Sequence, residues 1–194
     1  MNEEQHPWNV FPENKKGNKL ILGSFPPKRF TMNLENLQEN DISFFYGSSD
    51  NKFWEMFCVS KDLNYNWRLY PEKLKNYLID NNWIVSDIIL KTTRKVENAL
   101  DKDLIVTEWN TKIIKEILEN NNIETIYFTS KWVQERFCTK IFPSLTRIPK
   151  IVILISPSRN GLMSLNWARE IFPQLKAETN TNYRQRYYNH FLNL

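Results

Sequence analysis

Three short polar segments hold most of the residues whose types could do chemistry, and each follows an apolar run. They are GSFPP at residues 23–27, SDIILKTTRK at residues 86–95 and SPSRNG at residues 156–161. Each offers hydroxyls and backbone amides rather than a pair of carboxylates, and the third adds an arginine beside an asparagine and a glycine. Serine hydroxyls and backbone N–H groups position phosphates, and an arginine next to a turn can enter a nucleic-acid groove. The segments therefore indicate a clamp for a phosphate and a base.

Signatures of other chemistries are missing from the chain. It has neither a Walker lysine motif nor the G-x-G-x-x-G pattern, which removes the usual support for ATP or dinucleotide binding. Cys58 and Cys138 lie far apart and belong to no metal-ligand spacing. The two histidines, His6 and His190, lie near the two ends. We therefore expect no metal, no cofactor and no catalysis by histidine.

The first segment follows the apolar run Leu20 to Leu22, which must position it. Such a short run fits a strand buried on both faces or a piece of buried helix, and we favour the strand. Gly23 lets the backbone approach another group closely, and Pro26 and Pro27 predict a stiffened loop rather than a helix start. Loops at the carboxyl ends of strands in an open α/β sheet line the ligand crevice. The turn is therefore a candidate site wall, and the alternative is an ordinary strand exit.

Apolar runs and amphipathic segments alternate along the whole chain, which predicts alternating strands and helices. Trp109 shares an apolar helical face with the isoleucines that follow, and Thr107 is expected to cap that helix. This order predicts a three-layer α/β/α sandwich with a mostly parallel central sheet, in a single domain over residues 1–194. The expected strands are 20–22, 83–90, 123–130 and 148–156. One helix is expected to begin near residue 50, and the other expected helices are 70–82, 107–122, 131–142, 162–175 and 182–192.

Composition narrows the class of protein. The chain has 194 residues, of which 41% are hydrophobic, and a formal net charge of +4. This hydrophobic share argues against disorder or a fibrous repeat, and the mild positive charge is compatible with a polyanionic partner. The first residues lack an apolar core of signal-peptide length, and no apolar run is long enough to span a bilayer. We therefore expect a soluble cytoplasmic protein.

Several motifs in a fixed order resemble the uracil-DNA glycosylase superfamily, and most of all its hypoxanthine (deoxyinosine) DNA glycosylase branch. They are HPW, LILGSFPP, FFYGSSDNKFW, SDIIL with NALDKDL, IYFTSK and LISPSRN, and they run from His6 to about Trp167. LILGSFP and NKFW are the most specific. The resemblance implies an α/β domain that flips a damaged base out of DNA and hydrolyses its N-glycosidic bond without metal or cofactor. The implied partner is DNA with a damaged or deaminated base, and we expect a monomer.

The resemblance also implies a role for individual residues near the base. Other branches carry Asp or Asn just after the first glycine, where this chain has Ser24 and Phe25. The implied catalytic residue is instead Asn51, which would orient a water, and the alternative is a helix-terminal residue beside a cap at Asp50. Tyr46 matches the ring that stacks on the flipped base, with Phe45 as the competing candidate. Gly23, Ser24, Phe25 and Thr129 are the other expected base contacts.

The third segment is expected to contact DNA. Ser156, Pro157 and Ser158 would pinch phosphates, while Arg159 to Leu162, including Asn160, would enter the minor groove and fill the vacated stack. For Arg159 the alternative is a solvated surface charge.

The chain departs from the family pattern at three places, one of which is the stretch from Lys28 to Ser43, which is longer than usual. Ser48 and Ser49 stand where His-Pro is common, and Thr129 and Ser130 stand where Asn-Gly is common. These departures leave uracil, hypoxanthine and xanthine open as substrates. They also leave open a catalytically silent nucleic-acid-binding protein, and an unrelated α/β enzyme acting on nucleosides or other small molecules.

Overall fold

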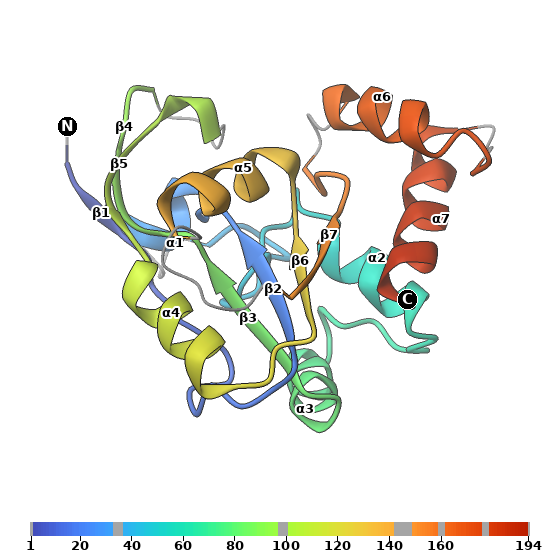
Figure 1. Cartoon of the computed structure of the whole chain (residues 1–194), viewed down its shortest axis with the longest axis horizontal. Helices are drawn as coiled ribbons and strands as arrows, with labels where there is room; N and C mark the ends of the chain where they lie inside the picture. Colours follow the sequence, from blue (N-terminus) through green and yellow to red (C-terminus); the bar gives the residue numbers. More distant parts are fainter. Residues whose placement is uncertain are drawn as a thin grey trace.

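A four-stranded parallel sheet forms the centre of the fold (Figure 1). The computed structural model describes residues 2–32, 37–96, 101–141, 149–158, 162–175 and 179–193. The strand order is β3-β2-β6-β7, so β2, the first long strand of the chain, lies inside the sheet. The four strands are β2 (Lys19–Gly23), β3 (Trp83–Asp87), β6 (Thr125–Phe128) and β7 (Lys150–Ile153).

Helices cover both faces of this sheet. Ile21 packs into the apolar cluster of one face, whereas Leu20 and Leu22 pack into the cluster of the other face, as strand alternation requires. This arrangement confirms the predicted three-layer α/β/α fold with a mostly parallel sheet. One layer holds α2 (Phe53–Ser60), α3 (Pro71–Asp80), α6 (Leu162–Ile171) and α7 (Asn180–Leu192), and the other holds α4 (Thr111–Asn120) and α5 (Lys131–Lys140).

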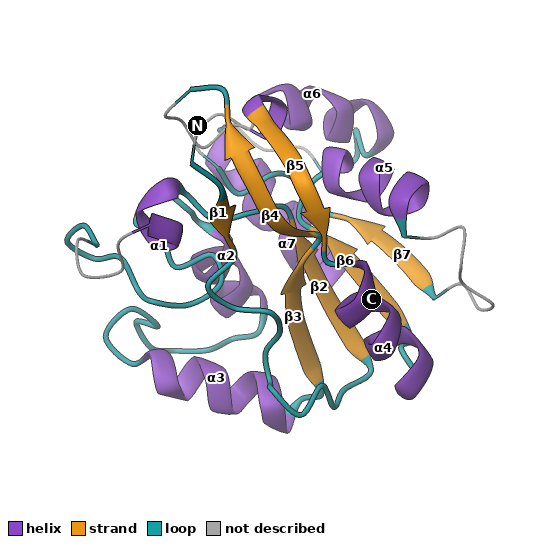
Figure 2. Cartoon of the chain, turned by 90° about the vertical axis from the view of Figure 1, so that its left-hand side faces the viewer, coloured by secondary structure: helices purple, strands orange, loops and turns teal. Residues whose placement is uncertain are grey.

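A second, antiparallel sheet was not predicted from the sequence (Figure 2). Its order is β1-β4-β5, and the short 3-10 helix η2 lies between β4 and β5. The prediction of a helix from residue 107 is wrong at its start, because residues 107–109 belong to β5, which pairs with β4, and the helix begins at Thr111. Thr107 is therefore a strand residue and no helix cap. The elements are β1 (Glu4–Gln5), β4 (Ile89–Arg94), η2 (Asp101–Asp103) and β5 (Leu104–Trp109).

The chain after the two prolines also differs from expectation. A short helix, α1 (Lys28–Met32), begins directly after Pro27, where only a stiffened loop was predicted. The Phe30 amide donates to the Pro27 carbonyl at 2.9 Å, and the Phe30 side chain is buried. Proline is compatible with a helix start because its missing N–H is not needed there. The loop between β2 and α1 is thus only residues 24–27.

Candidate active site

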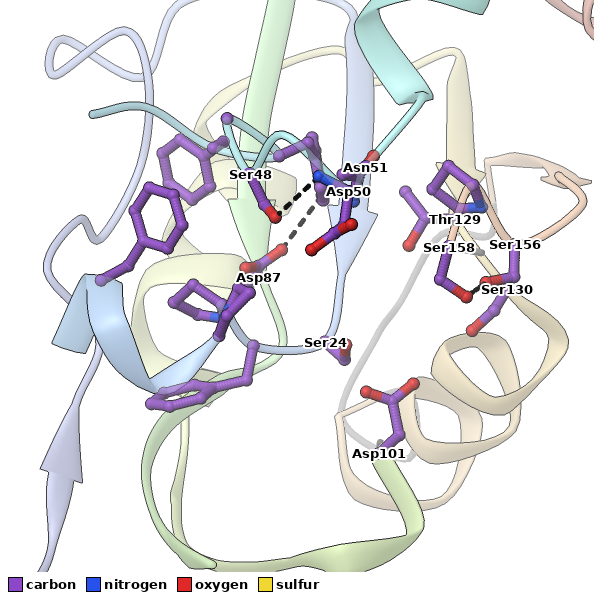
Figure 3. A pocket seen from close by; sticks show the side chains of 18 of the residues that line it. Ser24, Ser48, Asp50, Asn51, Asp87, Asp101, Thr129, Ser130, Ser156 and Ser158 are labelled. Carbon is purple, nitrogen blue, oxygen red and sulfur yellow. Dashed lines mark hydrogen bonds between the residues drawn. The ribbon is translucent and has the colours of Figure 1, made fainter. Parts of the chain in front are cut away.

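The loops at the carboxyl edge of the parallel sheet enclose a cavity of about 470 Å³ (Figure 3). The segment 44–51, which leads into α2, also contributes to the cavity wall. Gly23 does not line the cavity, and Arg159 and Asn160 lie outside the described residues. The remaining residues expected at a site all line it: Ser24, Phe25, Tyr46, Asn51, Thr129, Ser156, Pro157 and Ser158.

Gly23 is placed behind the cavity, where its missing side chain makes room for two others. It lies opposite Asp87 in the β2–β3 pairing. A Cβ atom at this position would lie 2.5 Å from both Asp87 Oδ1 and the Tyr46 hydroxyl oxygen. Real Cβ contacts are never that short, so only glycine allows Tyr46 and Asp87 to meet here.

A buried network joins Tyr46, Asp87 and His6. The Tyr46 hydroxyl donates to Asp87 Oδ1 at 3.0 Å, and His6 Nε2 lies 2.8 Å from Asp87 Oδ2. The Trp8 backbone N–H donates to His6 Nδ1 at 3.0 Å, so the proton on a neutral His6 is on Nε2 and points at Asp87. Burial, and then the Asp87 charge, raise the pKa of Tyr46 well above its ordinary value. Tyr46 therefore stays a neutral donor whose ring is fixed at the cavity wall.

Sequence reasoning missed His6 because it set both histidines aside as terminal residues. The contact with Asp87 joins positions 81 residues apart in sequence, and no spacing rule reports such a pair. The available signal was the HPW motif at residues 6–8, which the family resemblance had included. His6 does not line the cavity and reaches it only through Asp87.

Carboxylates were also missed, since the three polar segments were read for hydroxyls and amides. Asp50, Asp87 and Asp101 all line the cavity. In Figure 3, Asp101 points into the cavity from the side opposite Asp50 and Asn51, with Ser24 between them. Burial, reinforced by the Asp87 charge, raises the pKa of Asp101 to about 6, although a hydrogen bond from Ser24 and the Arg94 charge oppose this shift. Asp50 is at the rim, with 54% of its side chain exposed.

Asn51 lies at the cavity wall, directly before the first residues of α2. Its carboxamide oxygen accepts a hydrogen bond from the Phe53 backbone N–H at 2.9 Å. Such a bond satisfies one of the free amides at a helix start. The contact that the helix-terminal alternative expected from Asp50 is therefore made by Asn51. A carbonyl oxygen has two lone pairs, and one remains for a water or a ligand.

Arg68 binds backbone carbonyl groups of the segment that contains Asn51. Its guanidinium donates to the carbonyl oxygens of Gly47 at 3.3 Å, Ser48 at 3.2 Å and Asn51 at 3.1 Å. It also pairs with the Glu55 carboxylate of α2 at 3.2 Å. The planar fork of arginine can make these bonds together, which the single ammonium of a lysine cannot.

We expect Arg68→Lys to lower the free energy of unfolding by about 1 to 3 kcal/mol, because carbonyl oxygens at the cavity wall lose a charged donor. Chemical denaturation with Arg136→Lys as the matched control measures this, since Arg136 is exposed on α5 and should change stability by less than about 0.5 kcal/mol. Equal losses of unfolding free energy in the two variants would show that Arg68 does not hold the segment 47–51 in place.

Arg29 and Asp41 fix the same segment from the other side. Arg29 donates to both Asp41 oxygens, at 2.6 and 3.1 Å, and to the Ser48 hydroxyl at 2.7 Å. Burial alone would raise the pKa of Asp41, but hydrogen bonds from Arg29 and from the backbone amides of Ser49 and Gln38 hold it below its ordinary value. The Ser48 hydroxyl, at one of the positions that depart from the family pattern, is thus held by Arg29.

The loop after β7 is tied to the start of α2 and to α7. The Lys52 backbone N–H donates to the Pro157 carbonyl at 3.3 Å, and Arg184 donates to the Ser158 carbonyl at 3.4 Å. The Ser156 and Ser158 hydroxyl oxygens lie 3.0 Å apart. These contacts bring the serine loop beside Asn51, although the two segments are about a hundred residues apart in sequence.

The chain has the α/β fold of uracil-DNA glycosylase-like proteins: three layers, with a pocket at the carboxyl edge of the parallel sheet. One solved structure with a similar fold is the solution structure of a protein from Methanosarcina acetivorans, described as a putative uracil DNA glycosylase. The two folds align with a TM-score of 0.54 over 98% of this chain and 99% of that chain, at 15% sequence identity. At this identity the likeness establishes the fold alone.

Comparisons by sequence identify no relative: no protein-family model matches the chain, and no curated protein matches it. Among the residues that the structure describes, no three His, Cys, Asp or Glu side chains are grouped so that they could hold a metal ion. In the same part of the chain, no helix is both long enough and apolar enough to cross a membrane.

Proposed function

We propose that residues 1–194 form one DNA glycosylase domain, which hydrolyses the N-glycosidic bond of a deaminated base flipped out of DNA. The observation that carries this proposal is that Tyr46, Asn51 and the serine loop at residues 156–158 line one cavity. Its volume of about 470 Å³ is in the range of small-molecule sites and suits a nucleoside. The similarity of the fold to that of a protein described as a putative uracil DNA glycosylase supports the same proposal.

The proposed reaction places positive charge on the sugar and negative charge on the base. The C1′–N bond breaks with its electron pair on the base, a water oxygen bonds to C1′, and one water proton is released while the base gains one. Asn51 orients the water through its remaining lone pair, and the Asp50 and Asp87 carboxylates favour the positive charge that develops at C1′. The products are the free base and an abasic site.

Tyr46 is the better of the two proposed stacking rings. Phe45 is only 1% exposed, so it offers little of its face to a ligand, whereas Tyr46 is half-buried at the wall. The Tyr46 ring is held 4.7 Å from the Phe53 ring and by its bond to Asp87, which lowers the entropy cost of stacking on a base. Ser24, Phe25 and Thr129 are the proposed contacts for the base edge, with hypoxanthine or uracil as the base.

The serine loop is the proposed contact for DNA phosphates. Its hydroxyls and backbone amides need no sequence information to hold a phosphate, and they would fix the strand beside Asn51. Arg159 and Asn160 follow directly in sequence and remain predicted minor-groove residues. The net charge of +4 predicts only weak non-specific DNA affinity, which falls with salt.

A second candidate is a nucleic-acid-binding protein that keeps this fold without catalysis. Two observations favour it: the Asn51 oxygen already accepts from Phe53, and Ser48 and Ser49 replace the common His-Pro. One assay separates the two candidates.

We expect the purified protein to release at least one of uracil, hypoxanthine or xanthine from duplex or single-stranded oligonucleotides, detected by alkaline cleavage of the abasic site. Release should be unchanged by excess EDTA, since the proposed reaction uses side chains and water only. An oligonucleotide without a modified base is the matched control. Binding without release would support the silent protein, and loss of activity with EDTA that added metal restores would contradict the proposed chemistry.

A further inference from the structure

Asp101 is a cavity residue for which the reaction described above has no use. It comes from η2, which the antiparallel sheet places against the parallel one, and its side chain points into the cavity beside Ser24 (Figure 3). Ser24 belongs to the loop proposed as the base-side wall, whereas Asn51 lies across the cavity from Asp101. The carboxyl group is therefore placed to meet the base rather than the attacking water.

We propose that Asp101 is the general acid of this site, which gives its proton to a purine base as that base leaves the sugar. The inference rests on the proposed glycosylase function. A purine has ring nitrogens, N7 and N3, that accept a proton as the glycosidic bond breaks, and an acid at the base side of the cavity is suited to supply it. A departing uracil carries its charge on N1 and the carbonyl oxygens and gains less from such an acid.

Burial, more than any neighbouring charge, keeps the pKa of Asp101 above that of a solvated carboxyl. Desolvation is the main cause, and the Asp87 charge from β3 adds to it, while Ser24 from the β2–α1 loop and Arg94 from β4 act in the opposite direction. Arg94 is shared with Glu4, which accepts from it at 2.9 and 3.1 Å. On η2 itself the neighbouring charges are Lys102 and Asp103, and Thr129 and Ser130, which line the cavity from the β6–α5 turn, are uncharged.

The proton balance is simple. The C1′–N9 bond breaks with its electron pair on the purine, and the Asp101 carboxyl proton passes to a ring nitrogen, so that the base leaves neutral. Water adds to C1′ and loses one proton to solvent, and the Asp101 carboxylate regains a proton from solvent. Asp87, which accepts hydrogen bonds from His6 and Tyr46, takes no part in this proton transfer. Two carboxyl groups in different environments thus take different roles.

The test measures single-turnover excision of hypoxanthine, xanthine and uracil between about pH 4 and pH 8, for the parent protein, Asp101→Asn and Asp103→Asn. Asp103 is the matched control because it is in the same short helix but does not line the cavity. We expect purine excision by the parent to fall about tenfold per pH unit above about pH 6. Asp103→Asn should keep this fall, and Asp101→Asn should be slow and lack it.

A stability measurement tests the same carboxyl without DNA. The folded pKa of Asp101 lies above the unfolded value of 3.8, so the native state holds an extra proton between pH 3.8 and about 6. Stability from this group is present below that window and is lost as the pH rises through it. The melting temperature of Asp101→Asn minus that of the parent should therefore be larger at pH 7 than at pH 4.

The outcomes separate this inference from the proposed function. If hypoxanthine is excised and Asp101→Asn keeps the parent's pH dependence, the general acid is wrong and the glycosylase stands. Excision of uracil but of neither purine also overturns the inference alone. If the parent excises no base at any pH, the proposed function fails and the inference fails with it.

Discussion

Replacing Asn51 with alanine is expected to lower single-turnover excision by about 100-fold to 1,000-fold, while DNA affinity stays close to that of the parent. The lost interaction orients the attacking water and so acts mainly in the transition state. Ser24→Ala, which changes the opposite wall, should cost much less. The assay uses the best substrate found among the modified oligonucleotides.

The cap contact of Asn51 calls for a second variant. Because its oxygen accepts from the Phe53 N–H, Asn51→Ala should also lower the free energy of unfolding by about 1 kcal/mol. Asn51→Ser keeps a capping oxygen but shortens the side chain, so it should melt near the parent and still excise slowly. Full activity in Asn51→Ala, or a larger loss in Ser24→Ala, would mean that the loop at residues 24–27 holds the water instead of Asn51.

The second large effect is expected at the buried ion pair of Glu4 and Arg94, whose side chains are only 3% and 5% exposed. Arg94 also donates to the Pro26 carbonyl at 2.6 Å, and Thr31 donates to Glu4 at 2.6 Å. The pair thus holds the end of the 24–27 loop and the helix α1 that follows it. Glu4→Gln removes the carboxylate charge that is bonded to the buried Arg94 guanidinium and should lower the free energy of unfolding by about 3 to 5 kcal/mol.

The matched control for this prediction is Glu72→Gln on α3. Glu72 pairs with Lys75 at 2.7 Å, but its side chain is 73% exposed, so solvent screens the pair. Its loss should change stability by about 0 to 1 kcal/mol. Chemical denaturation of both variants gives the comparison. Similar small losses in both would show that the Glu4–Arg94 pair does not hold the loop in place.

The sequence by itself determined the parallel sheet and the position of the cavity at its edge. Short apolar runs such as Leu20–Leu22 predict buried strands, and the carboxyl ends of parallel strands lie at one edge whatever the loops contain. The turns after these strands were therefore expected at one site, and the structure brings Ser24, Thr129 and Ser156 to one cavity. The helix predicted over 70–82 is also present as α3, which begins at Pro71, a residue suited to the first helical position.

Only the tertiary structure decided which charged groups enter the cavity. In the antiparallel sheet β1 pairs with β4, and nearly half of the chain lies between these two strands in sequence. A two-residue strand such as β1 also carries no periodic signal of its own. Since that sheet brings His6 to Asp87 and η2 to Ser24, neither contact was readable from local pattern. Thr107 was likewise misassigned because pairing with β4 outweighs the local helical pattern. Local periodicity thus specified the strands and where their ends meet, whereas contacts between distant segments placed the acid, the histidine and the arginines around them.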